Sequence, residues 1–177
     1  MNLVYCDIET DGLLEDVSTI HCLVIYDDDT KETVAYNNKG NKEPVSRGAQ
    51  RLEDSDLIVG HNIINYDLPV LHKVYPWFTE PSVVIDTLIL SRIYHADMMR
   101  LDKKHNWKSM PLQLYGRHSL EAWGYRCGLR KGDYQEHSDF TEFNQDMFEY
   151  CERDVEVTHL LYDKIIKENL KDVKNVK

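Results

Sequence analysis

The sequence predicts an α/β domain built on a mixed sheet. Two observations point to this class: an early pair of strand-like segments is joined by a polar turn, and short apolar strands then alternate with helices. A chain of 177 residues, 42% apolar and 29% charged, is long enough to bury a full core. We therefore expect a single domain over residues 1–177.

The first third of the chain supplies the predicted hairpin and its neighbours. An apolar strand leads into Asp7-Ile8-Glu9-Thr10, which we interpret as an acidic turn. Two apolar segments then flank the turn Asp27-Asp28-Asp29-Thr30, as expected for a hairpin. The expected elements, in order, are strands at 3–6, 21–26 and 31–36, a helix at 45–55 and a buried strand at 57–60.

The remaining elements are expected to be mainly helical. Pro69 falls in the first turn of one predicted helix, where proline is tolerated, and Ser119 is a plausible N-cap of another. The basic stretch at 98–114 lacks clear periodicity and is expected to be an extended loop. The expected elements are a helix at 66–74, a buried strand at 83–85, and helices at 86–95, 119–127 and 142–170.

Charge is distributed unevenly along the chain. The formal net charge of −10 argues against a nucleic-acid partner, because phosphate binding favours a basic surface. Residues 92–132, however, hold nine Lys and Arg against three acids, a local charge of +6, so the rest carries −16. A solvated basic loop is the alternative interpretation. The basic residues of this segment are Arg92, Arg100, Lys103, Lys104, Lys108, Arg117, Arg126, Arg130 and Lys131.

No apolar run approaches the length of a membrane span, so no membrane partner is expected. Because the first strand is predicted to begin near residue 3, no targeting peptide is expected. The four cysteines are scattered, without the paired spacing of a zinc site or a redox motif. A reduced, cytoplasmic protein is expected.

Asp7 and Glu9 follow the first strand two residues apart, so their side chains project from the same face. Their Cα atoms would lie roughly 7 Å apart, and the two carboxylates repel each other unless a cation lies between them. Hard oxygen ligands of this kind suit Mg²⁺ or Mn²⁺. The alternative is a strand that simply ends in a polar turn, as Gly12 suggests.

Two further carboxylates come from predicted helices. Asp154 falls on the apolar stripe of the last helix, where a buried carboxylate needs a cation or hydrogen-bond donors, or else a paired arginine or a helix end. Tyr150 lies one turn earlier on the same face. Asp67 heads a helix that follows a buried strand; it could be a simple helix cap, but open α/β sheets bind ligands at such strand ends.

Together these residues resemble the three exonuclease motifs of the DnaQ-like DEDD superfamily. The motifs are Asp7-x-Glu9, Asn62-x-x-x-Tyr66-Asp67 and Tyr150-x-x-x-Asp154, in matching order and spacing. A tyrosine four residues before the last aspartate, with glutamate rather than histidine five before it, indicates the tyrosine subtype.

The segments between the motifs, at 21–27, 85–92 and 116–126, are similar to the proofreading domains of T-odd phage DNA polymerases of family A. The resemblance implies a ribonuclease H-like fold with a mixed five-stranded sheet and flanking helices. We expect a stand-alone phage-type nuclease without a polymerase domain after residue 177, located in the host cytoplasm if a phage encodes it. An excised domain of a longer chain is the alternative.

The resemblance implies a 3′–5′ exonuclease with two Mg²⁺ or Mn²⁺ ions. Asp7 would contact both ions, Glu9 and Asp154 the ion that carries the attacking water, and Asp67 the second ion. Tyr150 would orient the water. The implied product is a nucleoside 5′-monophosphate.

The resemblance also implies substrate contacts and partners. Leu13, four residues after Glu9, corresponds to an apolar wedge that unstacks the terminal base, although core packing is an alternative. The expected substrate is the 3′ end of single-stranded DNA, with RNA or a short oligonucleotide as a variant and a separate DNA polymerase as a candidate partner. An accessory binding module of a polymerase is the competing hypothesis. The remaining candidate substrate-binding residues are Thr10, His61, Asn62 and His118.

Overall fold

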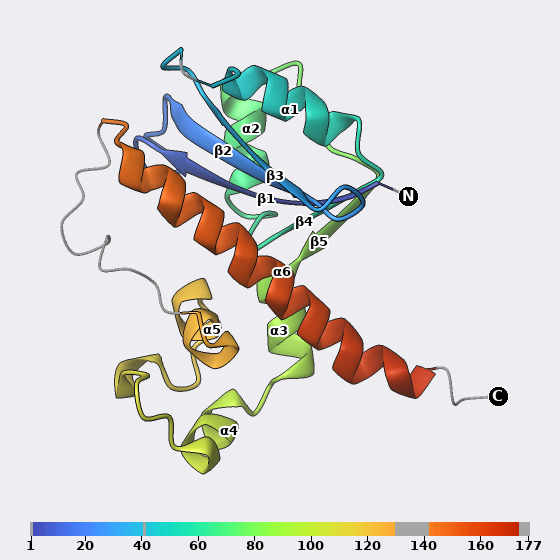
Figure 1. Ribbon diagram of the computed structural model, residues 1–177, viewed down its shortest axis with the longest axis vertical. Coiled ribbons are helices and arrows are strands. Elements are labelled where there is room, and N and C mark those ends of the chain that lie inside the picture. Colours follow the sequence, from blue (N-terminus) through green and yellow to red (C-terminus); the bar gives the residue numbers. More distant parts are fainter. Residues whose placement is uncertain (1, 41, 130–141, 174–177) are drawn as a thin grey trace.

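The structure is a computed structural model that describes residues 2–40, 42–129 and 142–173. Within these residues a five-stranded sheet has the order β3-β2-β1-β4-β5 (Figure 1). The first three strands pair antiparallel, and β1–β4 and β4–β5 pair parallel. The sheet is therefore mixed, as predicted. Its strands are β1 (Leu3–Thr10), β2 (Ile20–Asp27), β3 (Glu32–Asn37), β4 (Leu57–Gly60) and β5 (Val83–Asp86).

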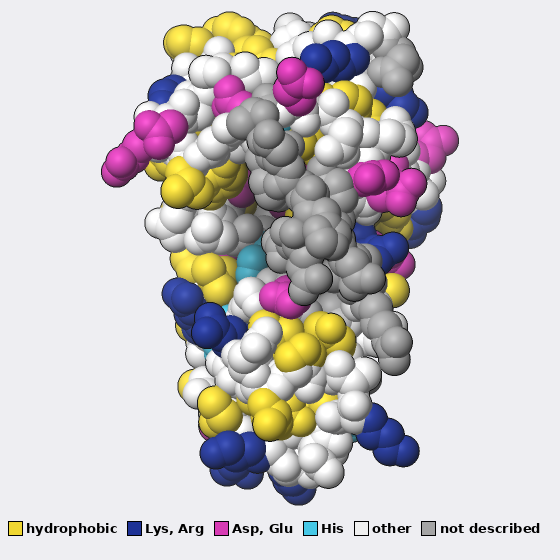
Figure 2. Space-filling view, turned by 90° about the vertical axis from the view of Figure 1, so that its left-hand side faces the viewer, with side chains coloured by type: hydrophobic (Ala, Val, Ile, Leu, Met, Phe, Trp, Pro, Cys, Tyr) yellow, Lys and Arg dark blue, Asp and Glu magenta, His cyan; other side chains and the backbone are white. Residues whose placement is uncertain are grey.

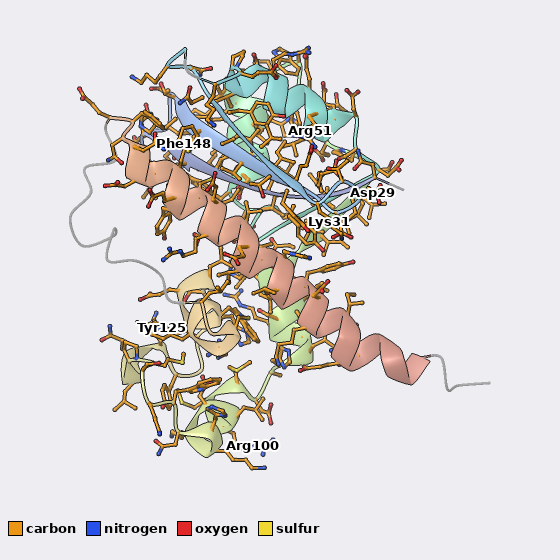
Figure 3. All side chains as sticks on the ribbon, in the orientation of Figure 1. Asp29, Lys31, Arg51, Arg100, Tyr125 and Phe148 are labelled. Atoms are coloured by element: carbon orange, nitrogen blue, oxygen red, sulfur yellow. The ribbon has the colours of Figure 1, made fainter. Side chains whose placement is uncertain are left out.

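Helices cover both faces of this sheet. One apolar core joins α1 and α2 to one face, and a second joins the first half of α6 to the other, where Phe148 packs (Figure 3). The helices are α1 (Val45–Glu53), α2 (Asp67–Val74), α3 (Thr87–Tyr94), α4 (Met98–His105), α5 (Leu120–Cys127) and α6 (Gln145–Val173), with a short 3-10 helix, η1 (Leu112–Leu114).

Strand β1 alternates between these two cores. Val4, Cys6 and Ile8 pack with α1 and α2, whereas Tyr5 packs with α6. Side chains two residues apart share a face of a strand, so the odd-numbered residues after Tyr5 also face α6. This alternation turns the acidic residues at positions 7 and 9 toward the last helix.

The acidic segment at 7–10, expected to be a turn, is strand. Its residues stay paired with β2 as far as Thr10, which lies opposite Ile20. The register shifts between Glu9 and Thr10, as in a β-bulge, and such irregularities often lie next to active sites. Asp7 and Glu9 therefore stand on a paired strand and not on a loop.

Strand β5, expected to be buried, lies at the edge of the sheet. Val83 is 45% exposed, and Val84 and Ile85 are half-buried. An apolar run of three residues does not distinguish a central strand from an edge strand.

The stretch at 98–114, expected to be an extended loop, contains α4 and η1. Asp102 is the reason: it is 1% exposed and accepts hydrogen bonds from Trp107 Nε1, Gly116 N and two nitrogens of Arg126. A buried carboxylate of this kind organises the segment from within. Its partners lie up to 24 residues away, beyond the reach of a periodicity argument.

The helices α4 and α5 pack against the second half of α6 and form a lobe away from the sheet (Figure 1). Ser119 caps α5 by accepting from Ala122 N at 3.4 Å, as predicted. The basic side chains of this lobe include Arg100, labelled in Figure 3. Two of the predicted basic residues, Arg130 and Lys131, lie outside the described residues.

None of the described helices is both long enough and apolar enough to cross a bilayer. The four cysteines are free thiols, and Cys6, Cys22 and Cys151 are buried in the cores as expected for small apolar side chains.

Candidate active site

Asp7 lies at the centre of a cluster of carboxylates. Burial, followed by the negative charges of Asp67, Asp154 and Glu9, raises the pKa of Asp7 well above its usual range. Cys151, on α6, donates its thiol hydrogen to the Asp7 backbone oxygen at 3.2 Å and so ties the helix to β1. The structure thus brings together the four carboxylates that the sequence singled out.

Asp67 reaches the cluster from the first residue of α2. It is 4% exposed, and burial raises its pKa to about 7. Backbone amides, among them that of Ile8, oppose this shift, while the charges of Asp86 and Asp154 add to it. The N-cap of this helix is Tyr66, and Asp67 is its first residue, where an acidic side chain is favoured.

Asp154 and Tyr150 descend from α6 onto the same site. Asp154 is 6% exposed, and Tyr150 is half-buried one turn earlier. Burial raises the pKa of Tyr150, and the charges of Asp154, Glu9 and Asp7 raise it further. The Tyr150 hydroxyl therefore stays protonated at neutral pH and remains available as a hydrogen-bond donor.

The donor set fits divalent cations. Neighbouring carboxylates raise the pKa of Asp7 and of Asp67, so the cluster ionises fully only when positive charge is placed among its members, and carboxylate oxygens are the ligands that Mg²⁺ and Mn²⁺ prefer. Across residues 2–40, 42–129 and 142–173, no three or more His, Cys, Asp or Glu side chains are arranged as they stand so that they could hold a metal ion. The fit thus rests on the chemistry and the mutual repulsion of these oxygens.

The pKa of Asp67 predicts a pH-dependent stability of the metal-free protein. A carboxyl whose pKa rises from 3.8 to about 7 on folding binds more protons in the folded state between these values. The free energy of unfolding should then fall as pH rises from about 4 to about 7, by roughly 1.4 kcal/mol per unit at most. Urea unfolding in chelator at several pH values measures this slope.

The matched variant is Asp67→Asn, which keeps the shape and removes the titrating group. Its slope between the same pH values should be clearly smaller, and added Mg²⁺ should stabilise the wild type more than the variant. Equal slopes for the two proteins would contradict the assignment.

The turn after β1 is held by hydroxyl groups. Thr10 Oγ1 and the Tyr66 hydroxyl both lie within hydrogen-bond distance of Gly12 O, at 2.9 and 2.8 Å, and they contact each other. Thr10, a predicted substrate contact, is only 6% exposed, so its side chain is used to hold the turn and is not exposed to a substrate. Tyr66, conversely, was part of a motif without an assigned role, and here it fixes the turn beside the carboxylates.

Leu13 stands out from this turn into solvent and is 77% exposed. The loop beneath it is fixed: the Asp11 carboxylate accepts from Ser18 N and Thr19 N at 2.9 and 3.0 Å. Leu14, the next residue, packs against the core instead. Leu14 is therefore the leucine that packs in the core. Leu13 is exposed to solvent, as the wedge interpretation requires.

His61 and Asn62 lie at the end of β4, where the chain turns toward α2. Thr87 donates to Gly60 O at 3.2 Å, so His61 Nδ1 carries the hydrogen that Thr87 accepts at 2.9 Å. Asn62 adopts a left-handed backbone, φ 63°. The sequence interpretation missed the residue that holds this turn, Asp86.

Asp86 is 4% exposed and accepts from the backbone N–H groups of Asn62 and Ile64 at 3.0 and 3.3 Å. It also caps α3 by accepting from Leu88 N at 2.9 Å. An aspartate between a strand and a helix is the usual signal of a helix cap, and this signal was present in the sequence. Its second role, toward the turn after β4, depends on the parallel pairing of β4 with β5.

His118 contacts Ser91 of α3 and the Trp123 ring of α5. Its Nδ1 donates to Ser91 Oγ at 3.0 Å, because that hydroxyl already donates to Leu88 O. Burial and the charges of Arg126 and Arg92 lower the pKa of His118, so the ring is neutral near pH 7. The structure does not place His118 among the carboxylates. On the face shown in Figure 2, Lys and Arg side chains lie in both halves, whereas the acidic side chains lie in the upper half and near the middle and leave the bottom of the molecule to basic and apolar groups.

Comparison with known proteins assigns this arrangement to a family. The sequence model of the RNase_H superfamily matches residues 4–166, and the chain belongs to that superfamily. The chain is 34% identical to the DNA-directed DNA polymerase of Escherichia phage T7 and 32% identical to that of Enterobacteria phage T3. Each match covers 94% of this chain and 27% of the polymerase, so the chain spans about a quarter of these relatives.

Solved structures show the same fold. Brucella melitensis NrnC matches 98% of this chain and 76% of its own, with a TM-score of 0.65 and 20% identity. Escherichia coli RNase D matches 94% of this chain and 39% of its own, with a TM-score of 0.58 and 16% identity. The predicted ribonuclease H-like fold and the predicted similarity to T-odd phage DNA polymerases are confirmed.

Proposed function

We propose that the chain is a metal-dependent 3′–5′ exonuclease that removes nucleoside 5′-monophosphates from single-stranded DNA. One observation carries the proposal: Asp7, Glu9, Asp67 and Asp154 meet from β1, α2 and α6 with charges that repel one another. The similarity to two phage DNA polymerases supports DNA as the substrate.

The four carboxylates would hold two Mg²⁺ or Mn²⁺ ions, which supply a water of lowered pKa and stabilise charge on the phosphoryl oxygens. The structure of NrnC with bound Mg²⁺ supports this choice of ion. In hydrolysis, a water oxygen attacks phosphorus while the bond to the 3′-oxygen breaks. The released nucleotide keeps its 5′-phosphate.

The other residues of the site would position the two reactants. Tyr150, protonated and one helical turn from Asp154, would hold the attacking water by a hydrogen bond. Leu13, 77% exposed on a fixed loop, would pack against the terminal base and separate it from its neighbour. Thr10 would contact the substrate through its backbone, because its hydroxyl is used within the turn.

A 5′-labelled single strand tests the proposal. With Mg²⁺ or Mn²⁺, purified protein should produce a ladder that shortens from the 3′ end, and chelator should stop it. If the strand does not shorten in a metal-dependent way, the proposed exonuclease activity is refuted, and an accessory module that docks to a polymerase is favoured.

A short RNA oligonucleotide is the second candidate substrate. NrnC has been solved bound to pGG, and RNase D is described as an exoribonuclease that acts in structured RNA processing. An RNA strand of the same sequence and a dinucleotide, assayed beside the DNA strand, separate the alternatives. Faster cleavage of either would replace DNA as the proposed substrate.

Replacing Tyr150 by phenylalanine should slow cleavage and leave the site assembled. The variant loses only the hydroxyl that positions water, so kcat should fall about 10–100-fold, at or below the usual range for such groups. Single-turnover kinetics measure the effect, and KM and Mg²⁺ dependence should stay close to wild type. Tyr26→Phe is the control, because the Tyr26 ring packs against His159 of α6, 4.8 Å between ring centroids, more than two turns beyond Tyr150. An unchanged rate in Tyr150→Phe would contradict the role.

A further inference from the structure

A second cavity lies in the lobe, away from the carboxylates. It has a volume of about 640 Å³ and is bordered by the end of α3, by α4 and α5, and by the second half of α6; we name it the α4–α6 cavity. Lys164 and Glu168 on its wall follow Asp154 by ten and fourteen residues, about 15 and 21 Å along the helix. The volume is ample for a small organic molecule.

The floor of this cavity carries two buried nitrogen atoms that lack hydrogen bonds. Trp123 is 0% exposed and His95 is 9% exposed, and their rings lie 5.3 Å apart. Among the residues that the structure describes, neither Trp123 Nε1 nor His95 Nε2 has a hydrogen-bond partner. The nearest carboxylate oxygen to His95 Nε2 belongs to Glu168, at 3.8 Å.

Native proteins satisfy nearly all buried polar atoms, so two unsatisfied atoms in one floor indicate an absent ligand or solvent. Trp107 lines the same cavity, but its Nε1, unlike that of Trp123, donates a hydrogen bond to Asp102 at 3.0 Å. The indole N–H and the imidazole nitrogen belong to rings whose centroids lie 5.3 Å apart, so one molecule that carries both an acceptor and a donor group could partner both. The edge of a nucleobase has this arrangement.

The walls and the rim of the cavity also suit a nucleotide. Met98, Leu101 and the Trp107 ring, which stacks on His105 at 3.6 Å, supply apolar and aromatic surface. Lys104 stands at the rim, exposed and without an ion pair in the described part of the chain. Lysine ammonium groups are common ligands of phosphate.

The charged groups already paired in the cavity are not available to a ligand. Arg126 gives all three of its guanidinium nitrogens to Asp102 and to Arg117 O, at 2.7 to 3.0 Å. Lys164 is bound to Glu168 at 2.8 Å. Lys104 is therefore the cation to which an incoming anion would bind.

We propose that the α4–α6 cavity binds a nucleoside monophosphate, with its base against Trp123 and His95 and its phosphate on Lys104. Met98, an unbranched and adaptable side chain on the cavity wall, would move to uncover the floor. This second site is separate from the carboxylates, and the proposal does not depend on the nuclease activity.

Indole N–H resonances of the full chain test the proposal in chelator, where metal-dependent binding at the carboxylates is suppressed. The chain has three tryptophans, and Trp77→Phe and Trp107→Phe assign their signals by elimination. Addition of dTMP should shift the Trp123 signal in a saturable way and leave Trp77 unchanged. Thymidine should bind about tenfold more weakly because it lacks the charged contact, and inorganic phosphate should not shift Trp123.

Two variants make the test specific. Lys104→Glu should weaken dTMP binding at least about tenfold, whereas Lys103→Glu, exposed and next to it but off the cavity, should bind like wild type. Leu101→Trp should fill the cavity and abolish the shift while circular dichroism shows an intact fold. Three results would each overturn the proposal: an unmoved Trp123 signal at millimolar dTMP, equal binding of thymidine and dTMP, or equal weakening by both lysine variants.

Discussion

Asp7→Asn is expected to abolish cleavage. Asp7 interacts with all three other carboxylates, so losing its charge should disrupt the binding of both proposed ions. We expect a loss on the order of 10³-fold or more in kcat/KM, measured on the 5′-labelled single strand with saturating Mg²⁺. The fold should survive, because asparagine replaces a buried charge by a neutral group of the same shape.

The controls separate chemistry from folding. Asp154→Asn should behave like Asp7→Asn, whereas Asp16→Asn, an exposed aspartate on the loop after β1, should retain the wild-type rate. In chelator, the melting temperature of Asp7→Asn should equal or exceed that of the wild type, since one source of repulsion is gone. A wild-type rate in either site variant would contradict the proposed ligand set.

Asp102→Ala is expected to destabilise the lobe strongly. The substitution removes a carboxylate that is 2% exposed in its side chain and leaves the Arg126 guanidinium, 4% exposed, without its counter-charge. Breaking a buried pair from one side costs about 3–5 kcal/mol, and here the N–H groups of Trp107 and Gly116 also lose their acceptor. Urea unfolding monitored by tryptophan fluorescence measures the loss.

The pKa of Asp102 gives an independent check on this pair. Burial alone would raise it, but hydrogen bonds from Arg126 and Gly116 outweigh burial and hold the pKa below its ordinary value. The stabilisation is therefore present above pH 4 and lost in more acidic solution, so wild type and variant should converge there. Lys103→Ala, exposed on the next position of α4, should change stability little. A loss below about 1 kcal/mol in Asp102→Ala would show that the pair is dispensable.

The sequence predicted the sheet and most helices because their signals are local. Strand periodicity, the Asp-rich hairpin turn and the Ser119 cap each depend on neighbouring residues, and each is present in the structure. The candidate carboxylates were visible in the sequence for a related reason: Asp7 shares a strand face with Glu9, and Asp154 falls on an apolar helix stripe, where a buried charge needs a partner.

What the sequence did not predict depends on distant contacts. Helix α4 forms around Asp102, whose partners come from η1's end and from α5. The second role of Asp86 needs β5 beside β4, and the exposed position of β5 follows from strand order. In each case the deciding neighbour is separated by more than ten residues, so no window of sequence contains both.

Helix α6 has 29 residues and is about 43 Å long, and it touches both the sheet and the lobe. Asp154 and Tyr150 lie in the half of α6 that packs on β1, and the contacts with α5 lie in its other half. A rigid tilt of the helix caused by a change in the lobe would therefore move the two site residues. A tilt of about 4° about its middle displaces a side chain 15 Å from the pivot by about 1 Å. Misplacement of that size can slow catalysis on the order of 100-fold, so mutations buried in the lobe should be screened as changes in rate as well as in stability.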